Sequence, residues 1–84
     1  MNENELIEEL EKLGVSNKSY SLNGEFKVDA YIINKVYGKC EFYYIDEKGR
    51  KEDKRYFISK NEAYKYLLDK FKFESKYPGK LFSE

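Results

Sequence analysis

The chain has 84 residues, of which 40% are hydrophobic and 38% are charged. The length predicts one domain over residues 1–84, and the apolar content is enough for a small core, which excludes disorder as the default. The 16 basic and 16 acidic residues cancel, so the chain has no general electrostatic attraction for nucleic acid or an anionic membrane.

The first predicted element is an amphipathic helix over residues 3–13. Its glutamates fill one face, and its apolar residues recur at helical spacing on the other. The apolar residues are Leu6, Ile7, Leu10 and Leu13. Asn2 or Asn4 can cap the start of this helix, and Gly14 stands where a left-handed residue usually ends one.

A series of strands and turns follows the helix. Residues 20–22 predict a short strand that ends at the turn pair Asn23-Gly24. Residues 27–36, 39–46 and 51–58 predict three further strands. They are separated by turns at Tyr37-Gly38 and at residues 47–50. The charged first half of the last strand indicates an edge position in the sheet.

The last predicted element is a second helix. Ser59 and Glu62 form a capping box, apolar residues follow at helical spacing, and the helix is expected to end near residue 73. Residues from about 75 to 84 are predicted to be a flexible tail. The order of elements predicts an α+β domain with an N-terminal helix, a three- to four-stranded antiparallel sheet and a C-terminal helix.

A two-residue turn at Tyr37-Gly38 fixes which residues share a sheet face. It places Ile33 opposite Phe42 and Tyr31 opposite Tyr44, and a four-residue turn at 47–50 places Phe57 opposite Cys40. This face is the more apolar one, so we expect both helices to pack on it. One helix on each face, or a register shifted by one residue, remains an alternative.

The second sheet face carries Ile32, Tyr43 and Ile45. If no other element covers these residues, they form an exposed apolar patch of the kind that often marks an interface. Tyr43 and Tyr37 are then the tyrosines best placed to contact a partner.

Residue types that carry catalysis are scarce. The chain has no His, which removes the usual general base and the commonest metal ligand. Cys40 is the single cysteine, so the chain can form neither an internal disulfide nor a structural zinc site of several cysteines, and we expect Cys40 in the core. We therefore expect a protein that is not an enzyme and that uses no metal or other cofactor.

Three segments in order resemble the small bacterial immunity proteins of contact-dependent inhibition and other polymorphic toxin systems. They are "YSLNGE", "DAYIINKVYGKCEFYYIDEKGRK" and "FISKNEAYKYLLDKF". The resemblance covers roughly residues 5–71 and rests on the order of the segments. One departure is Cys40, which stands where the family pattern has Trp.

The resemblance implies a non-catalytic protein that binds the C-terminal domain of a cognate toxin in the cytoplasm. Such toxins are often nucleases with basic substrate grooves, so acidic side chains would imitate phosphates and speed association. The candidate toxin-binding residues are Glu5, Glu8 and Glu9 on the first helix, Glu41 and Tyr43 on the second sheet face, and Asp46 and Glu47 at its turn. For the helix glutamates, a solvated surface is the alternative interpretation.

Two other functions stay open. The first is a small nucleic-acid-binding or regulatory module that uses the sheet and the basic hairpin 48–55, "KGRKEDKR", although acids interrupt this run. The second is a self-associating domain that forms a homodimer. The sequence has no signal segment and no apolar run of membrane-spanning length, so we expect a cytoplasmic protein without a membrane partner.

Overall fold

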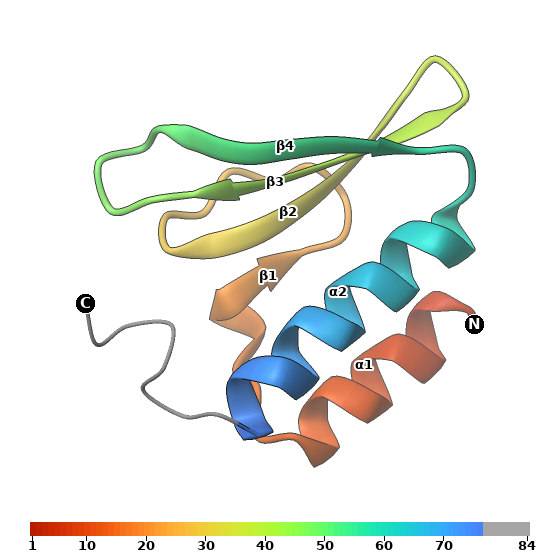
Figure 1. Ribbon diagram of the computed structural model, residues 1–84, viewed down its shortest axis with the longest axis vertical. Helices are drawn as coiled ribbons and strands as arrows, with labels where there is room; N and C mark the ends of the chain where they lie inside the picture. The colour runs from red at the N-terminus through yellow and green to blue at the C-terminus, as the bar shows by residue number, and fades with distance from the viewer. Residues whose placement is uncertain (77–84) are drawn as a thin grey trace.

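The computed structural model describes residues 1–76, which form two helices on one face of a four-stranded sheet (Figure 1). The elements are α1 (Glu3–Lys12), the 3-10 turn η1 (Asn17–Ser19), β1 (Tyr20–Ser21), β2 (Ala30–Val36), β3 (Lys39–Ile45), β4 (Lys51–Phe57) and α2 (Lys60–Lys76). The predicted α+β class is confirmed. The sheet is mixed rather than wholly antiparallel, because β1 runs parallel to β2 in the order β1-β2-β3-β4.

The second helix is longer than predicted. It continues to Lys76, so the first two residues of the expected tail at 75–84 belong to α2. The remaining eight residues of that expected tail lie outside the described part of the chain.

Both helices begin at polar caps that the sequence predicts. Asn2 Oδ1 accepts a hydrogen bond from the Glu5 N–H at 2.8 Å, and the Glu5 side chain accepts one from the Asn2 N–H at 2.9 Å. In α2, Ser59 Oγ accepts from the Glu62 N–H at 3.3 Å. These bonds satisfy N–H groups that the first turn of a helix leaves without a partner.

The central hairpin has the predicted register. Ile33 pairs with Phe42 and Tyr31 pairs with Tyr44, and the turn residues Tyr37 and Gly38 both have positive φ, 47° and 78°. Positive φ at both positions gives a two-residue turn the twist of the strands that it joins.

As predicted, one core lies between the two helices and the sheet face that carries Ile33 and Phe42. It contains Leu6, Leu10, Tyr20, Ile33, Cys40, Phe42, Ala63, Tyr64, Leu67, Leu68 and Phe71. Cys40 is therefore a buried residue of the core.

The register between β3 and β4 changes along the pair. Cys40 pairs with Phe57 as predicted, but Ile45 pairs with Lys51, so the turn takes five residues instead of four. Between the pairs Phe42–Arg55 and Tyr44–Glu52, β4 contains one extra residue, a β-bulge, so the register beyond it is the predicted one. Asp53 lies at this bulge and has a φ of 57°. The bulge directs Asp53 toward α2, where its Oδ2 lies 3.4 Å from Lys70 Nζ.

Residues 22–29 connect the parallel strands β1 and β2 and cross the sheet face opposite the helices, as the orange segment of Figure 1 shows. The residues of β2 and β3 that point to this face form a second buried cluster, separate from the main core, of Ala30, Ile32, Tyr43 and Ile45. The second face is therefore not an exposed apolar patch. Tyr43 is only 4% exposed, and the expectation that it lies on the surface is wrong.

Polar contacts fix the path of the crossover loop. The Gly24 N–H donates to the Ile33 carbonyl at 3.0 Å. Lys27 Nζ donates to the carbonyls of Asn17 and Tyr20, at 2.9 Å and 3.0 Å. The loop is thus tied to β2 on one side and to the start of β1 on the other.

Candidate functional site

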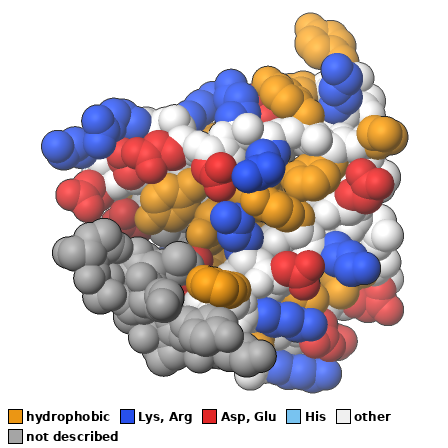
Figure 2. Space-filling view, viewed as in Figure 1, with side chains coloured by type: hydrophobic (Ala, Val, Ile, Leu, Met, Phe, Trp, Pro, Cys, Tyr) orange, Lys and Arg blue, Asp and Glu red, His pale blue; other side chains and the backbone are white. Residues whose placement is uncertain are grey.

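A groove of about 660 Å³ lies at the end of the sheet that carries the β3–β4 turn. Its lining residues are Ser19, Asp29, Tyr31, Tyr44, Glu47, Glu52, Asp53, Lys70, Phe71 and Glu74. We call it the acidic groove, because five carboxylates and one lysine line it. Figure 2 shows acidic side chains gathered around apolar surface at the left end of the molecule, where this turn lies in Figure 1.

Four segments of the chain bring these side chains together. Tyr31 and Tyr44 are cross-strand partners, and Glu52 pairs with Tyr44 on the other side, so the three side chains share one sheet face. The bulge adds Asp53 to this set. Lys70 and Glu74 are four residues apart on α2 and therefore lie on the same side of the helix.

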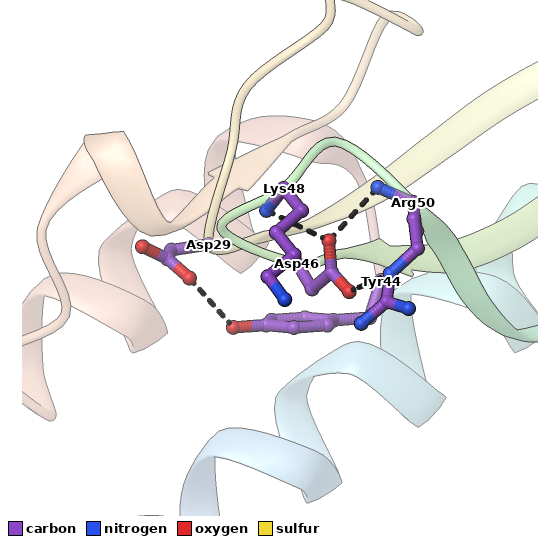
Figure 3. A network of polar contacts seen from close by, with 5 residues as sticks. All are labelled: Asp29, Tyr44, Asp46, Lys48 and Arg50. Atoms are coloured by element: carbon purple, nitrogen blue, oxygen red, sulfur yellow. Dashed lines mark hydrogen bonds and ion pairs between the residues drawn. The ribbon is translucent and has the colours of Figure 1, made fainter.

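Carboxylates accept hydrogen bonds from both tyrosine hydroxyls of the groove. Tyr31 donates to Glu74 Oε2 at 2.7 Å. Tyr44 donates to Asp29 Oδ1 at 3.4 Å, and Figure 3 shows this second hydrogen bond. Burial raises the pKa of each tyrosine, and the neighbouring carboxylates raise the pKa further. Both hydroxyls therefore stay protonated near neutral pH and act as donors.

The negative charge of the groove is only partly balanced within the protein. Asp53 lies 3.4 Å from Lys70 Nζ and 3.6 Å from an Arg55 guanidinium nitrogen. Among residues 1–74, whose side chains the structure describes, the other four groove carboxylates form no ion pair within 4.0 Å. They leave a negative surface that a cationic partner can neutralise.

Asp46 shapes the turn that carries Glu47. Its Oδ1 accepts hydrogen bonds from the N–H groups of Lys48 and Arg50, at 2.9 Å and 2.8 Å, and its Oδ2 accepts one from Arg50 Nε at 2.9 Å (Figure 3). The hydrogen bond from the Arg50 backbone is the main cause that lowers the Asp46 pKa to about 2. Asp46 thus holds the turn, and its oxygens are already engaged.

We expect Asp46 to make stability depend on pH in acid. Because its pKa is lowered in the folded protein, its stabilisation is present above pH about 4 and is lost as the pH falls through about 2. Asp46→Asn keeps an acceptor for the two N–H groups but cannot titrate. The variant should unfold at lower urea than the parent at neutral pH, and the difference should shrink in acid. Asp69→Asn, at an exposed position on α2, is the control. Equal differences at neutral and acid pH would contradict this role.

The predicted residues of α1 lie away from the groove. The Glu5 side chain completes the helix cap, and Glu9 lies 3.3 Å from Lys12 Nζ. Glu8 is exposed. These glutamates form an acidic surface of their own on the first helix.

The predicted residues of the sheet are also dispersed. Glu41 is buried, and its Oε2 lies 3.1 Å from Lys54 Nζ. Tyr43 is buried, and Lys51 Nζ lies 4.7 Å from the centroid of its ring. Of the seven candidates, Glu47 is the one that lines the acidic groove.

Sequence reasoning missed most of the groove. The predicted register places Tyr31 and Asp53 on either side of Tyr44, so a search for acids next to this pair would have found Asp53 and also Asp29, two residues before Tyr31. Glu74 gave no such signal, because its position depends on the direction in which α2 crosses the sheet.

The sequence matches no known protein family, no curated protein and no solved structure. In the described part of the chain, no group of three or more His, Cys, Asp or Glu side chains is arranged to hold a metal ion. No helix within residues 1–76 is long and apolar enough to cross a membrane. The groove itself offers carboxylate acceptors, tyrosine hydroxyls and aromatic surface, which together suit a cationic polypeptide surface.

Proposed function

We propose that this protein is a non-catalytic immunity protein that binds the C-terminal domain of a cognate toxin and blocks its activity in the cytoplasm. The acidic groove is the observation that carries the proposal. Its carboxylates and tyrosine rings suit a basic protein surface, such as the substrate groove of a nuclease. The order of sequence segments that resembles immunity proteins supports the same class of function.

The charge of the groove explains how such a partner would be captured. Complementary charges steer encounter and raise association rates from roughly 10⁵–10⁶ to as much as about 10⁸–10⁹ M⁻¹s⁻¹ at low salt. Aromatic rings then supply contact area at a small cost in side-chain entropy. Tyr31 and Tyr44 line the groove and are half-buried, so their rings would supply this contact area.

The structure gives less support to nucleic-acid binding by hairpin 48–55. Arg50 forms an ion pair with Asp46 at 2.9 Å, and Lys54 forms one with Glu41 at 3.1 Å. Arg55 lies 3.6 Å from Asp53. These internal pairs reduce the positive charge available for phosphates.

The first test is a pull-down of the tagged protein from its source cells at low and high salt. We expect recovery of one toxin, or of its C-terminal fragment, and loss of toxin activity at a fixed molar ratio. Recovery of nucleic acid that is released by salt would favour the nucleic-acid alternative. Recovery of only the tagged protein would contradict the immunity function.

Charge reversal then locates the contact surface. Glu47→Lys/Glu52→Lys should weaken toxin binding by about a hundredfold or more, because like charges placed across an interface cost several kcal/mol. Glu25→Lys, an exposed loop position, makes the same kind of change outside the groove and should bind normally. If Glu8→Lys abolishes binding and the groove variant does not, the contact surface is α1.

A further inference from the structure

The turn between β2 and β3 carries a tyrosine that the fold itself does not need. Tyr37 has a φ of 47°, and its side chain is fully exposed. Within the described residues it forms no hydrogen bond and no ring contact. Two-residue turns of this conformation favour Asn or Asp before Gly, because a positive φ crowds the Cβ of most other residues. Tyr37 therefore has a backbone cost that no contact within the molecule offsets.

Backbone strain of this kind is concentrated at functional sites, and the neighbours of Tyr37 indicate the chemistry of its partner. Lys35 and Lys39 are both exposed. Neither lysine forms an ion pair within 4.0 Å among residues 1–74. No acidic residue lies between Ala30 and Cys40. Residues 35–39, which we call the hairpin tip, thus present an aromatic ring between two unpaired positive charges. They suit a cavity lined by aromatic rings and carboxylates.

The acidic groove of this same protein is a cavity of that chemistry. Its volume of about 660 Å³ falls within the range of about 300–1,000 Å³ for pockets that hold small ligands. Tyr31 and Tyr44 provide half-buried rings. Glu47 and Glu52 are among the groove carboxylates without an ion pair in the described residues. The hairpin tip and the groove therefore match in both charge and aromatic character.

A hairpin tip cannot reach the groove of its own molecule. The tip precedes β3 and the β3–β4 turn follows it, and the seven residues of β3 hold these ends roughly 20 Å apart at about 3.3 Å per residue. Figure 1 shows the yellow-green tip projecting at the upper right, and the green β3–β4 turn at the left. Figure 2 shows hydrophobic and basic side chains together at the upper right. A groove that receives the tip must belong to another copy.

We infer that the hairpin tip of one molecule binds in the acidic groove of a second copy, with Tyr37 against the groove tyrosines and its two flanking lysines near Glu47 and Glu52. The contact joins two different surfaces, so it links copies head to tail. One hairpin tip is too small to bury the about 1,200–2,000 Å² of a stable complex, so the association is weak, reversible and sensitive to salt. Where the proposed function holds, an occupied groove is closed to the toxin, but the association itself does not depend on that function.

The test combines sedimentation and ¹⁵N NMR of the purified protein, from micromolar to millimolar concentration and without toxin. At low salt, we expect the average mass to rise with concentration, and added sodium chloride to lower it again. The N–H signals of Tyr37, Glu47 and Glu52 should shift together along the series. Tyr37→Asn should stay monomeric. It should also unfold at higher urea than the parent, because Asn suits the turn.

Two variants that each lose one half of the contact give the sharpest measurement. Tyr37→Asn keeps the groove, Glu47→Lys/Glu52→Lys keeps the tip, and each alone should be monomeric. Mixed together, they should form a complex of two molecules that grows no further, because the remaining tip and the remaining groove are both altered. Glu25→Lys, at an exposed position outside both surfaces, is the control and should associate like the parent.

The inference is overturned if the parent stays monomeric at every concentration, if Tyr37→Asn still associates, or if the mixture gives no complex. Toxin binding is measured separately by the pull-down, so a failure here leaves the proposed function standing.

Discussion

Replacing Phe42 with alanine should destabilise the protein by about 3–5 kcal/mol, the usual range for removal of a buried phenyl ring. Phe42 is fully buried at the centre of β3. Its ring stacks on Tyr31 at 5.5 Å between centroids and meets Tyr66 edge-on at 4.9 Å. Tyr31 also meets Phe71 of α2 edge-on at 5.3 Å, so Phe42 belongs to a network of rings that joins β2 and β3 to α2. A chain of this length has a total stability on the order of 4–13 kcal/mol, so the loss is a large fraction of it.

Urea unfolding measures this effect as a fall in the midpoint at an unchanged slope. Ile58→Ala is the control, because Ile58 is 84% exposed and should change stability by no more than about 0.5 kcal/mol. A loss below about 1.5 kcal/mol in Phe42→Ala would show that the core closes around the missing ring, against the packing described here.

Gly24→Ala should cost about 2–4 kcal/mol, although it adds a single methyl group. Gly24 has a φ of 80°, a left-handed conformation that costs an L residue about 1–2 kcal/mol. A Cβ at this position would also lie 2.9 Å from Asn34 Cγ, so the Asn34 side chain must move. Overpacking of this kind costs about 1–3 kcal/mol.

Two further variants separate these contributions. Gly14 has nearly the same φ, 79°, with no atom within 4 Å of an added Cβ, so Gly14→Ala measures the backbone cost alone. Adding Asn34→Ala to the Gly24→Ala variant removes the contact with the new methyl group. It should recover the stability by which Gly24→Ala falls below Gly14→Ala. If Gly24→Ala and Gly14→Ala lose equal stability, the contact with Asn34 has no energetic effect.

The local structure could be predicted from the sequence because it depends on nearby residues. Asn2 and Ser59 cap their helices through groups within three residues. Tyr37 and Gly38 set the hairpin register, and that register decides which side chains face the helices. Each of these features rests on the spacing of polar, apolar and turn residues.

The parts of the fold that could not be predicted depend on contacts between segments that are distant in the sequence. A strand of two residues carries no information about whether it will lie parallel or antiparallel to β2. The crossover loop was taken as a simple turn, because Asn23-Gly24 is typical of hairpins. It instead continues across the second face, and Tyr43 on that face is buried rather than exposed.

The acidic groove, too, could be predicted only in part from the local sequence. Glu47 could be identified from its place in a turn, but Glu52 shares the sheet face of the groove only because this turn takes five residues instead of the predicted four. The position of Glu74 follows from the packing of α2 across the sheet. A groove made of four segments is defined by tertiary packing rather than by a local motif.

The bulge at Asp53 also affects how copies of this protein behave at high concentration. Strand β4 is at the edge of the sheet, and the free backbone groups of an edge strand can pair with a strand from another molecule, which leads to aggregation. The left-handed residue bends the first half of β4, and charged side chains occupy positions 50–55. Both features oppose the addition of a foreign strand. We therefore expect the folded protein to resist edge-to-edge aggregation at high concentration.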